Sequence, residues 1–242
     1  MIDLAGRGAV VVGGAGGIGQ ALVSALARAG AATACLDVRP PPVGSGARFF
    51  AVDVTDPESV AAALEAACGA VGQLDRLVYT AGIARDRPLW KLQDDEWRDV
   101  LAVNLTGAFH VLRAATPRLR AAQLARPGAA VVLVASINGE RGKRGQANYA
   151  ASKAGLVALG KTAARELGHF GIRVNLLSPG MIDTAMTRGL ATEVRAAARA
   201  EAALERAGQP EDVAGPALFL LSDLAAHVTG QVLRVDGGQL IA

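Results

Sequence analysis

A serine, a tyrosine and a lysine near the middle of the chain have the side chains and the spacing needed to protonate a reduced carbonyl. They lie in VVLVASINGERGKRGQANYAASKAG, residues 131–155, as Ser136, Tyr149 and Lys153. Tyrosine and lysine four residues apart share one face of a helix. Hydride addition leaves an alkoxide, and a phenol protonates it well only if nearby positive charge lowers its pKa from about 10. Ser136 would polarise the carbonyl oxygen by donating a hydrogen bond.

An asparagine extends this group. Asn104 lies in DVLAVNLTGAFHVL, an apolar helical stretch where an amide needs hydrogen-bond partners. A water held between Asn104 and Lys153 would continue a proton path from Tyr149 to solvent. An asparagine with a purely structural role is the alternative. Tyr149 allows the same alternative, because the helix that contains Tyr149 also has an apolar face.

A glycine-rich turn near the start of the chain predicts a nucleotide site. In VVVGGAGGIGQALVSALARAGA, residues 10–31, an apolar run enters the turn and a helix follows, whose first N–H groups could receive a pyrophosphate. The glycines fit two registers: GxGxxG at Gly14, Gly16 and Gly19, or GxxxGxG at Gly13, Gly17 and Gly19.

Two acidic residues at the ends of apolar runs would complete such a site. Asp37 follows Gly19 by eighteen residues, a spacing that places a carboxylate on the adenosine ribose hydroxyls. This favours NAD over NADP, because the carboxylate repels a 2′-phosphate, although Arg39 is close enough to weaken the repulsion. Asp53 would meet the adenine through its side chain or through the amide of Val54. A turn or a helix cap is the alternative for both aspartates.

The elements that must position these residues alternate along the chain. Apolar runs of strand length predict strands near 8–13, 32–37, 48–53, 74–80, 129–135, 172–177 and 231–235, with helices beginning near Gly17, Pro57, Asp94, Asn148 and Pro210. This order predicts a single α/β domain over residues 1–242, with a parallel sheet covered by helices on both faces. In TDPESVAAAL, Thr55 or Asp56 is expected to cap the helix, and Glu58 to close a capping box with Thr55.

Composition excludes several other classes. The net charge of +3 is small and the basic residues are scattered apart from Arg141, Lys143 and Arg144, which, with 4% aromatic residues, argues against nucleic-acid binding. No apolar run reaches the roughly 18 residues of a membrane span. Cys35 and Cys68 are expected to be reduced, buried thiols, which predicts a cytoplasmic protein without a metal site.

The sequence resembles the short-chain dehydrogenase/reductase family over the whole chain. The resemblance rests on the glycine turn, Asp37, Asn104, Ser136, Tyr149, Lys153 and the segment SPGMIDT. The resemblance implies a Rossmann-type doubly wound sheet of seven strands, a nicotinamide cofactor and, as a rule, a homotetramer. The family pattern TGxxxGxG selects Gly13, Gly17 and Gly19, with the Ile18 amide at the phosphates. In SPGMIDT it places Pro179 and Gly180 beside the nicotinamide, and Ile182 and Thr184 at its carboxamide and a phosphate. Tyr149 and Lys153 would both face the cofactor, the lysine through the ribose hydroxyls.

The sequence departs from the family pattern in two places. Val12 stands where the family has threonine, which removes a hydroxyl beside the glycine turn. YTAG, residues 79–82, stands where the family usually has NNAG. Thr80 can still form a hydrogen bond, and Ala81 and Gly82 keep the close approach to the cofactor, so we expect activity to survive.

The substrate is a small carbonyl or alcohol compound that the sequence specifies less sharply. In this family the loop after Ser136 and a helical lid, here about residues 181–208, set the choice. Its candidate contacts are Trp90, Asn138, Met181, Ile182, Met186 and Leu190. GQANYAASKAGL and GQPEDVA look most like 3-oxoacyl-acyl-carrier-protein reductases, which predicts an extended β-keto thioester. A catabolic secondary-alcohol or hydroxyacyl dehydrogenase, a stereoselective ketone reductase and a non-catalytic NAD sensor are the alternatives.

Overall fold

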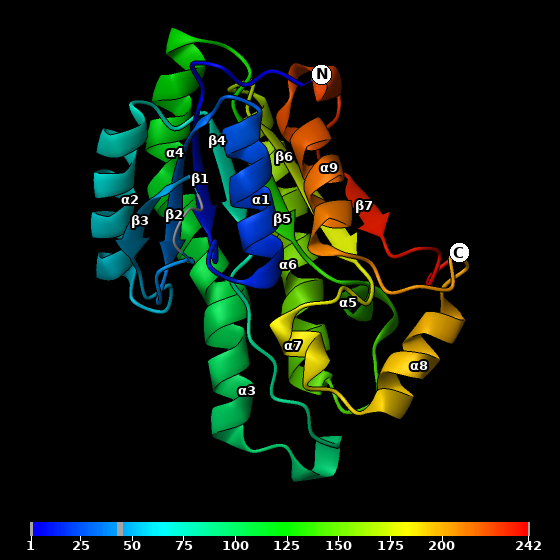
Figure 1. Cartoon of the computed structure of the whole chain (residues 1–242). Coiled ribbons are helices and arrows are strands. Elements are labelled where there is room, and N and C mark those ends of the chain that lie inside the picture. The colour runs from blue at the N-terminus through cyan, green and yellow to red at the C-terminus, as the bar shows by residue number, and fades with distance from the viewer. Residues whose placement is uncertain (1, 43–45, 242) are drawn as a thin grey trace.

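Seven parallel strands organise the computed structural model, which describes residues 2–42 and 46–241 (Figure 1). The strands are β1 (Gly8–Val12), β2 (Ala32–Asp37), β3 (Arg48–Ala51), β4 (Arg76–Tyr79), β5 (Ala130–Val134), β6 (Arg173–Pro179) and β7 (Val232–Val235). Their order across the sheet is β3-β2-β1-β4-β5-β6-β7. Every residue of GAVVV in β1 and of AVVLV in β5 is buried, as expected for parallel strands covered on both faces. The predicted fold class is therefore confirmed.

Helices cover both faces of this sheet (Figure 1). α1 (Gly17–Arg28) and α9 (Pro210–Leu221) pack together in one apolar core, which contains Val11 of β1. The other core contains Val10 of β1 and the buried faces of α2 (Pro57–Val71), α4 (Gly107–Ala125) and α6 (Ala147–Gly168). Neighbouring strand residues thus enter opposite cores, as the two-residue period of a strand requires.

The remaining helices lie at the end of the sheet where the strands finish. α3 (Asp94–Leu101) continues into α4 through a π-helical turn at Ala102–Thr106. The helical lid expected at about residues 181–208 contains α7 (Ala185–Arg188) and α8 (Thr192–Glu201), whereas no helix was predicted at α5 (Ile137–Arg141). Short 3₁₀ turns lie at Leu89–Lys91 and Asp223–Ala225. Within the described ranges, no helix combines the length and the apolar character that crossing a membrane would require.

The start of α2 corrects one expectation. The predicted capping box between Thr55 and Glu58 is wrong: Asp56 is the cap, and its carboxylate accepts from the Glu58 N–H at 2.9 Å. Thr55 is already engaged, because its hydroxyl donates to Asp53 at 2.7 Å. A hydroxyl used in the preceding turn is not free to cap the helix.

Candidate active site

The candidate site lies where the strand order reverses. β1 and β4 are neighbours at the centre of the sheet, and their chains leave in opposite directions, toward β2 on one side and β5 on the other. Open α/β sheets bind ligands in the crevice outside such a switch point. The glycine turn follows β1 and the pair Ala81 and Gly82 follows β4, so both line this crevice.

Backbone crowding distinguishes the two glycine registers. Gly13 has φ +82°, and a Cβ added there would lie 2.4 Å from Ala81 N. At Gly19 an added Cβ would lie 2.1 Å from Gly13 O, whereas at Gly16 the nearest atom would be 3.5 Å away, an ordinary contact. Glycine is thus required at Gly13 but not at Gly16, whereas Gly19 belongs to both registers and a Cβ added at Gly14 would lie 2.7 Å from the Cys35 side chain. The contrast between Gly13 and Gly16 favours the register GxxxGxG.

The turn also presents a helix N-terminus to the crevice. α1 begins at Gly17 and has no acidic residue in its first turn, so the positive end of its dipole is not neutralised. The first amides of the helix, including that of Ile18, have no carbonyl one turn earlier within the helix. A chain segment from the end of β6 reaches this point, because a Cβ added at Gly17 would lie 2.8 Å from Thr184 Cγ2. Thr184 therefore borders the same crevice, while the cofactor contacts expected of Pro179, Gly180 and Ile182 stay predictions.

Asp37 lies at the end of β2, beside the glycine turn. Its carboxylate accepts from the Ala15 N–H at 3.0 Å and from the Arg39 N–H at 3.3 Å. The side chain of Arg39 is exposed and forms no ion pair with Asp37, both residues being within the described part of the chain. Asp37 is partly buried and lies one strand away from the glycine turn. From this position its carboxylate would contact the ribose of a bound dinucleotide.

Asp53 has the geometry of a turn. It is exposed, and its carboxylate accepts from both the N–H and the hydroxyl of Thr55, which together lower the pKa of Asp53. Val54, the next residue, is buried. The adenine contacts expected of these two residues stay predictions.

Ser136 and Tyr149 meet at the other side of the crevice. Ser136 follows β5 and caps the short helix α5, where its hydroxyl accepts from the Asn138 N–H at 3.2 Å. Tyr149 lies in the first turn of α6, partly buried. Burial raises the pKa of Tyr149 to about 12, while a hydrogen bond with Ser136 lowers it and the carboxylate of Asp86 raises it. The lowered pKa expected from sequence is not found in the chain alone, because burial outweighs the other contributions.

Lys153 brings a buried positive charge to the same face of α6. Its ammonium donates to the main-chain oxygen of Val134 at 2.8 Å and lies 5.7 Å from the centre of the Tyr149 ring. The residue is 3% exposed, and burial lowers the pKa of the ammonium to about 8. The predicted pairing of phenol and lysine on one helix face is present, with the ammonium over the ring.

Asn104 occupies the π-helical turn and is fully buried. Its amide oxygen accepts from the Ile83 N–H at 2.8 Å, and its amide nitrogen donates to Ile83 O and to Ser152 Oγ, both at 3.0 Å. A Cβ added at Gly82 would lie 3.4 Å from Asn104 Oδ1 and 3.5 Å from Lys153 Nζ. Asn104 and Lys153 therefore flank Gly82 from two helices.

Ser152 is a site residue that the sequence analysis missed. Its hydroxyl donates to the main-chain oxygen of Tyr149 at 2.7 Å and accepts from Asn104, so it joins the asparagine to the tyrosine. Its hydroxyl is fully buried, a property that only the packing of α6 against the π-helical turn reveals. A second polar chain runs from Asn138 to Gln146 at 2.9 Å and from Gln146 to Asp86 at 2.8 Å. This chain of hydrogen bonds positions Asp86, whose carboxylate raises the pKa of Tyr149.

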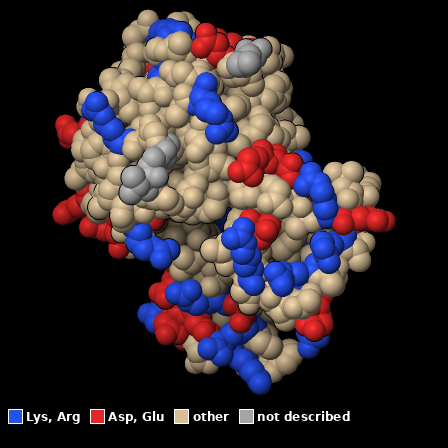
Figure 2. Space-filling view, in the orientation of Figure 1, with Lys and Arg blue, Asp and Glu red and all other residues tan. Residues whose placement is uncertain are grey.

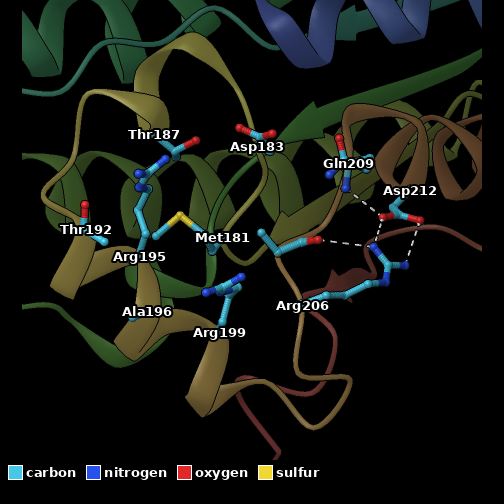
Figure 3. Close-up of a pocket in the computed structure, with 11 residues that line it drawn as sticks. Met181, Asp183, Thr187, Thr192, Arg195, Ala196, Arg199, Arg206, Gln209 and Asp212 are labelled. Atoms are coloured by element: carbon cyan, nitrogen blue, oxygen red, sulfur yellow. Dashed lines mark hydrogen bonds and ion pairs between the residues drawn. The ribbon is translucent and has the colours of Figure 1, made fainter.

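A hollow of about 730 Å³ lies under the predicted lid, between α7, α8 and the start of α9 (Figure 3). Its lining residues are Met181, Asp183, Thr187, Thr192, Arg195, Ala196, Arg199, Arg206, Ala207, Gln209 and Asp212. Arg206 pairs with Asp212 at 2.6 Å, whereas Arg195 and Arg199 form no ion pair with any described residue. Figure 2 shows basic side chains gathered over this part of the molecule.

The predicted substrate contacts are dispersed. Met181 lines the hollow, but Trp90, Asn138, Met186 and Leu190 do not. Trp90 is 77% exposed on the 3₁₀ turn at Leu89–Lys91, and Met186 is 51% exposed on α7. Asn138 is the one of these four that lies beside the catalytic group, two residues after Ser136. Their contact with substrate stays a prediction.

Comparison with known proteins assigns the fold and the site to a family. A family model described as enoyl-(acyl carrier protein) reductase matches residues 13–239. The 3-oxoacyl-acyl-carrier-protein reductase of Escherichia coli (strain K12) is 38% identical over 248 residues, covering 98% of each chain. The enzyme of that name from Thermotoga maritima is 36% identical, covering 98% of this chain and 99% of its own. The solved structure of a short-chain type dehydrogenase/reductase from Mycobacterium ulcerans superposes with a TM-score of 0.91 at 31% identity, covering 98% of this chain and 90% of the other.

Proposed function

The chain belongs to the short-chain dehydrogenase/reductase family, and we propose that it interconverts a ketone and a secondary alcohol with Tyr149 as general acid and base. Members of this family are oxidoreductases that use a nicotinamide cofactor. The observation that carries the proposal is the convergence of Ser136, Tyr149 and Lys153 beside the switch point of the sheet. Its test is the panel of ketones described below, assayed by the change in cofactor absorbance.

The residues of the crevice fit that cofactor. Gly13 lets the turn pack directly against Ala81, Gly82 carries no side chain beside Asn104 and Lys153, and the N-terminus of α1 offers amides to a pyrophosphate. When bound, the nicotinamide supplies or accepts the hydride. Ser136 donates a hydrogen bond to the carbonyl oxygen, and Tyr149 gives that oxygen its proton in reduction and takes it back in oxidation. Lys153 holds the ribose hydroxyls and supports the phenolate.

Asn104 and Lys153 help to return a proton to Tyr149 after it has protonated the substrate. Both side chains approach Gly82, and a water between them would pass protons from solvent to the phenol. A non-catalytic NAD sensor is the alternative of another class. Such a sensor would have no need of a tyrosine, a lysine and an asparagine arranged as a proton path, which supports an enzyme.

We propose NAD(H) rather than NADP(H) as the preferred cofactor. Asp37 supports it, since its carboxylate stands beside Ala15 at the glycine turn, where a 2′-phosphate would meet negative charge. The exposed Arg39 is the residue that could offset this repulsion. Catalytic efficiencies measured with NADH and NADPH test the proposal, and equal or better efficiency with NADPH would overturn it.

We propose a 3-oxoacyl thioester or a related β-keto compound as substrate. The names of the Escherichia coli and Thermotoga maritima relatives support this class. A thioester on a phosphate-bearing carrier also brings negative charge, to which Arg195 and Arg199 offer two guanidinium groups without acidic partners among the described residues. A catabolic hydroxyacyl or secondary-alcohol dehydrogenase and a stereoselective ketone reductase are the runners-up, favoured by the expected use of NAD.

The substrate test compares acetoacetyl thioester with cyclic and aryl ketones in the presence of NADH. The proposal expects the highest kcat/KM with the thioester. It also expects Arg195→Gln with Arg199→Gln to raise the KM of the thioester and to leave that of neutral ketones unchanged. If the thioester is turned over no faster than the ketones, the substrate assignment fails and the hydride chemistry stands.

We further propose that residues 181–208 act as the lid of a single domain and that the enzyme is a homotetramer. Ala151 and Ala154 are exposed on α6, and Phe109 is 43% exposed on α4, which would let these helices pair with symmetry mates. Gly155 packs on Leu105 of its own chain, where an added Cβ would lie 2.8 Å from Leu105 Cδ2. Light scattering at micromolar concentration tests the assembly, and a monomer mass would refute it.

A further inference from the structure

Tyr79 occupies the first position of the sequence YTAG, where this chain departs from the asparagine usual in its family. It is the last residue of β4, is fully buried, and donates its hydroxyl to the main-chain oxygen of Val103. Val103 directly precedes Asn104. We propose that Tyr79 is a positioning residue that holds the helical turn carrying Asn104, a role that rests on the proposed proton path through Asn104.

The π-helical turn explains why the Val103 oxygen needs this donor. In a regular α-helix the N–H of Gly107 would bond to Val103 O, four residues earlier. Here the N–H of Gly107 bonds to Ala102 O, five residues earlier. A buried carbonyl that loses its helical partner must find another, and π-helical turns often occur at functional sites for this reason.

The surroundings of the hydroxyl are shaped to admit it. A Cβ added at Gly107 would lie 2.8 Å from Tyr79 Oη, so only a glycine lets the phenol reach the helix at this level. Burial raises the pKa of Tyr79 far above its usual value. The hydroxyl therefore keeps its proton and stays a donor throughout the working pH range.

A chain of hydrogen bonds leads from this turn to the reacting tyrosine. Asn104 bonds to both main-chain groups of Ile83 and to Ser152, and Ser152 bonds to the main-chain oxygen of Tyr149. Tyr79 fixes the turn on the side of the sheet, while Ile83 and Ser152 fix it on the side of the cofactor. Releasing one support lets Asn104 shift, and displacements of a fraction of an ångström in such a group lower rates steeply.

Tyr79→Phe is the direct test, because it removes the hydroxyl and keeps the ring. Hydrogen exchange of the peptide containing Ile83 is followed by mass spectrometry in the full-length enzyme with NAD bound, together with kcat and KM. Exchange of the Ile83 N–H is expected to become about tenfold faster, since its acceptor is Asn104 Oδ1. The value of kcat is expected to fall at least about fivefold, with KM and cofactor affinity within twofold of wild type.

Thr116→Val is the matched control. Thr116 lies in α4, the helix that follows the π-helical turn. Its hydroxyl donates to the main-chain oxygen of Leu112 at 2.7 Å, away from the site. It should leave both the exchange at Ile83 and kcat unchanged. Unchanged exchange at Ile83 in Tyr79→Phe, or an equal effect of Thr116→Val, would overturn the proposal. Faster exchange with unchanged kcat would uphold the positioning role and refute the use of Asn104 in the proposed proton path.

Discussion

Replacing Lys153 with methionine should stabilise the protein while removing its activity. The buried ammonium has its pKa lowered from 10.5 to about 8 because burial disfavours its charge. Each pH unit corresponds to about 1.4 kcal/mol, so keeping the group charged costs about 3 kcal/mol at pH 7. Methionine is an unbranched apolar side chain that is one atom shorter than lysine and carries no charge. It forfeits the hydrogen bond from the charged ammonium to Val134 O, which offsets about 2 kcal/mol, and leaves a net gain of about 1 kcal/mol.

The pH dependence gives this prediction its sign. Below pH 8 the lysine is charged in both the folded and the unfolded chain, and the whole cost is present. Between pH 8 and 10.5 the folded chain releases its proton first, so the unfolded chain binds more protons and the stability of the wild type rises with pH. The advantage of Lys153→Met should therefore shrink by about 1 kcal/mol between pH 7 and pH 9.

Urea unfolding at fixed protein concentration measures both quantities. Lys161→Met is the matched control, because Lys161 is exposed on the same helix and should change the free energy of unfolding by less than about 0.5 kcal/mol at either pH. A Lys153→Met protein that is less stable than wild type at pH 7, or whose gain is the same at pH 9, would refute the reasoning. The buried lysine would then be compensated by contacts that the account omits.

Three further changes test separate parts of the site. Asp37→Ser should move the ratio of catalytic efficiencies toward NADPH by at least about tenfold, through a smaller KM for NADPH, and an unchanged ratio would contradict the role of the carboxylate. Gly13→Ala should abolish NADH binding, measured by fluorescence, because its Cβ would lie 2.4 Å from Ala81 N, whereas Gly16→Ala should bind normally. Equal NADH binding by the two variants would contradict the choice of the register GxxxGxG. Asp56→Ala should lower the free energy of unfolding by about 1 kcal/mol, as loss of a helix cap does, with kcat unchanged.

The sheet could be predicted from the sequence because its strands are buried on both faces. Runs such as AVVLV at β5 contain no polar residue, and each predicted strand overlaps the observed one. The starts of two helices were predicted at Pro57 and Pro210, because proline is favoured in the first turn of a helix. The helix α8 buries a single residue, Ala198, and begins without a side-chain cap, so the sequence predicted a helical lid but not the bounds of this helix.

The contacts within the site depended on features that no local pattern reveals. The sequence indicated Asn104 but not Ser152, whose role arises because α6 packs against the π-helical turn. It marked Tyr79 as a departure from the family pattern without showing that its hydroxyl reaches Val103. The lining of the hollow under the lid was missed as well, because Arg195 and Arg199 come together with Met181 only through the fold.

In the proposed reaction Tyr149 supplies and removes the proton at the substrate oxygen, and Tyr149→Phe removes this hydroxyl alone. The ketone that the wild type reduces fastest is assayed with NADH, and NADH binding is measured separately by fluorescence. The value of kcat should fall at least about a hundredfold, and the dissociation constant for NADH should stay within about threefold of wild type, since only the acid–base hydroxyl is removed. A variant that keeps more than about a tenth of the wild-type kcat would contradict this role of Tyr149.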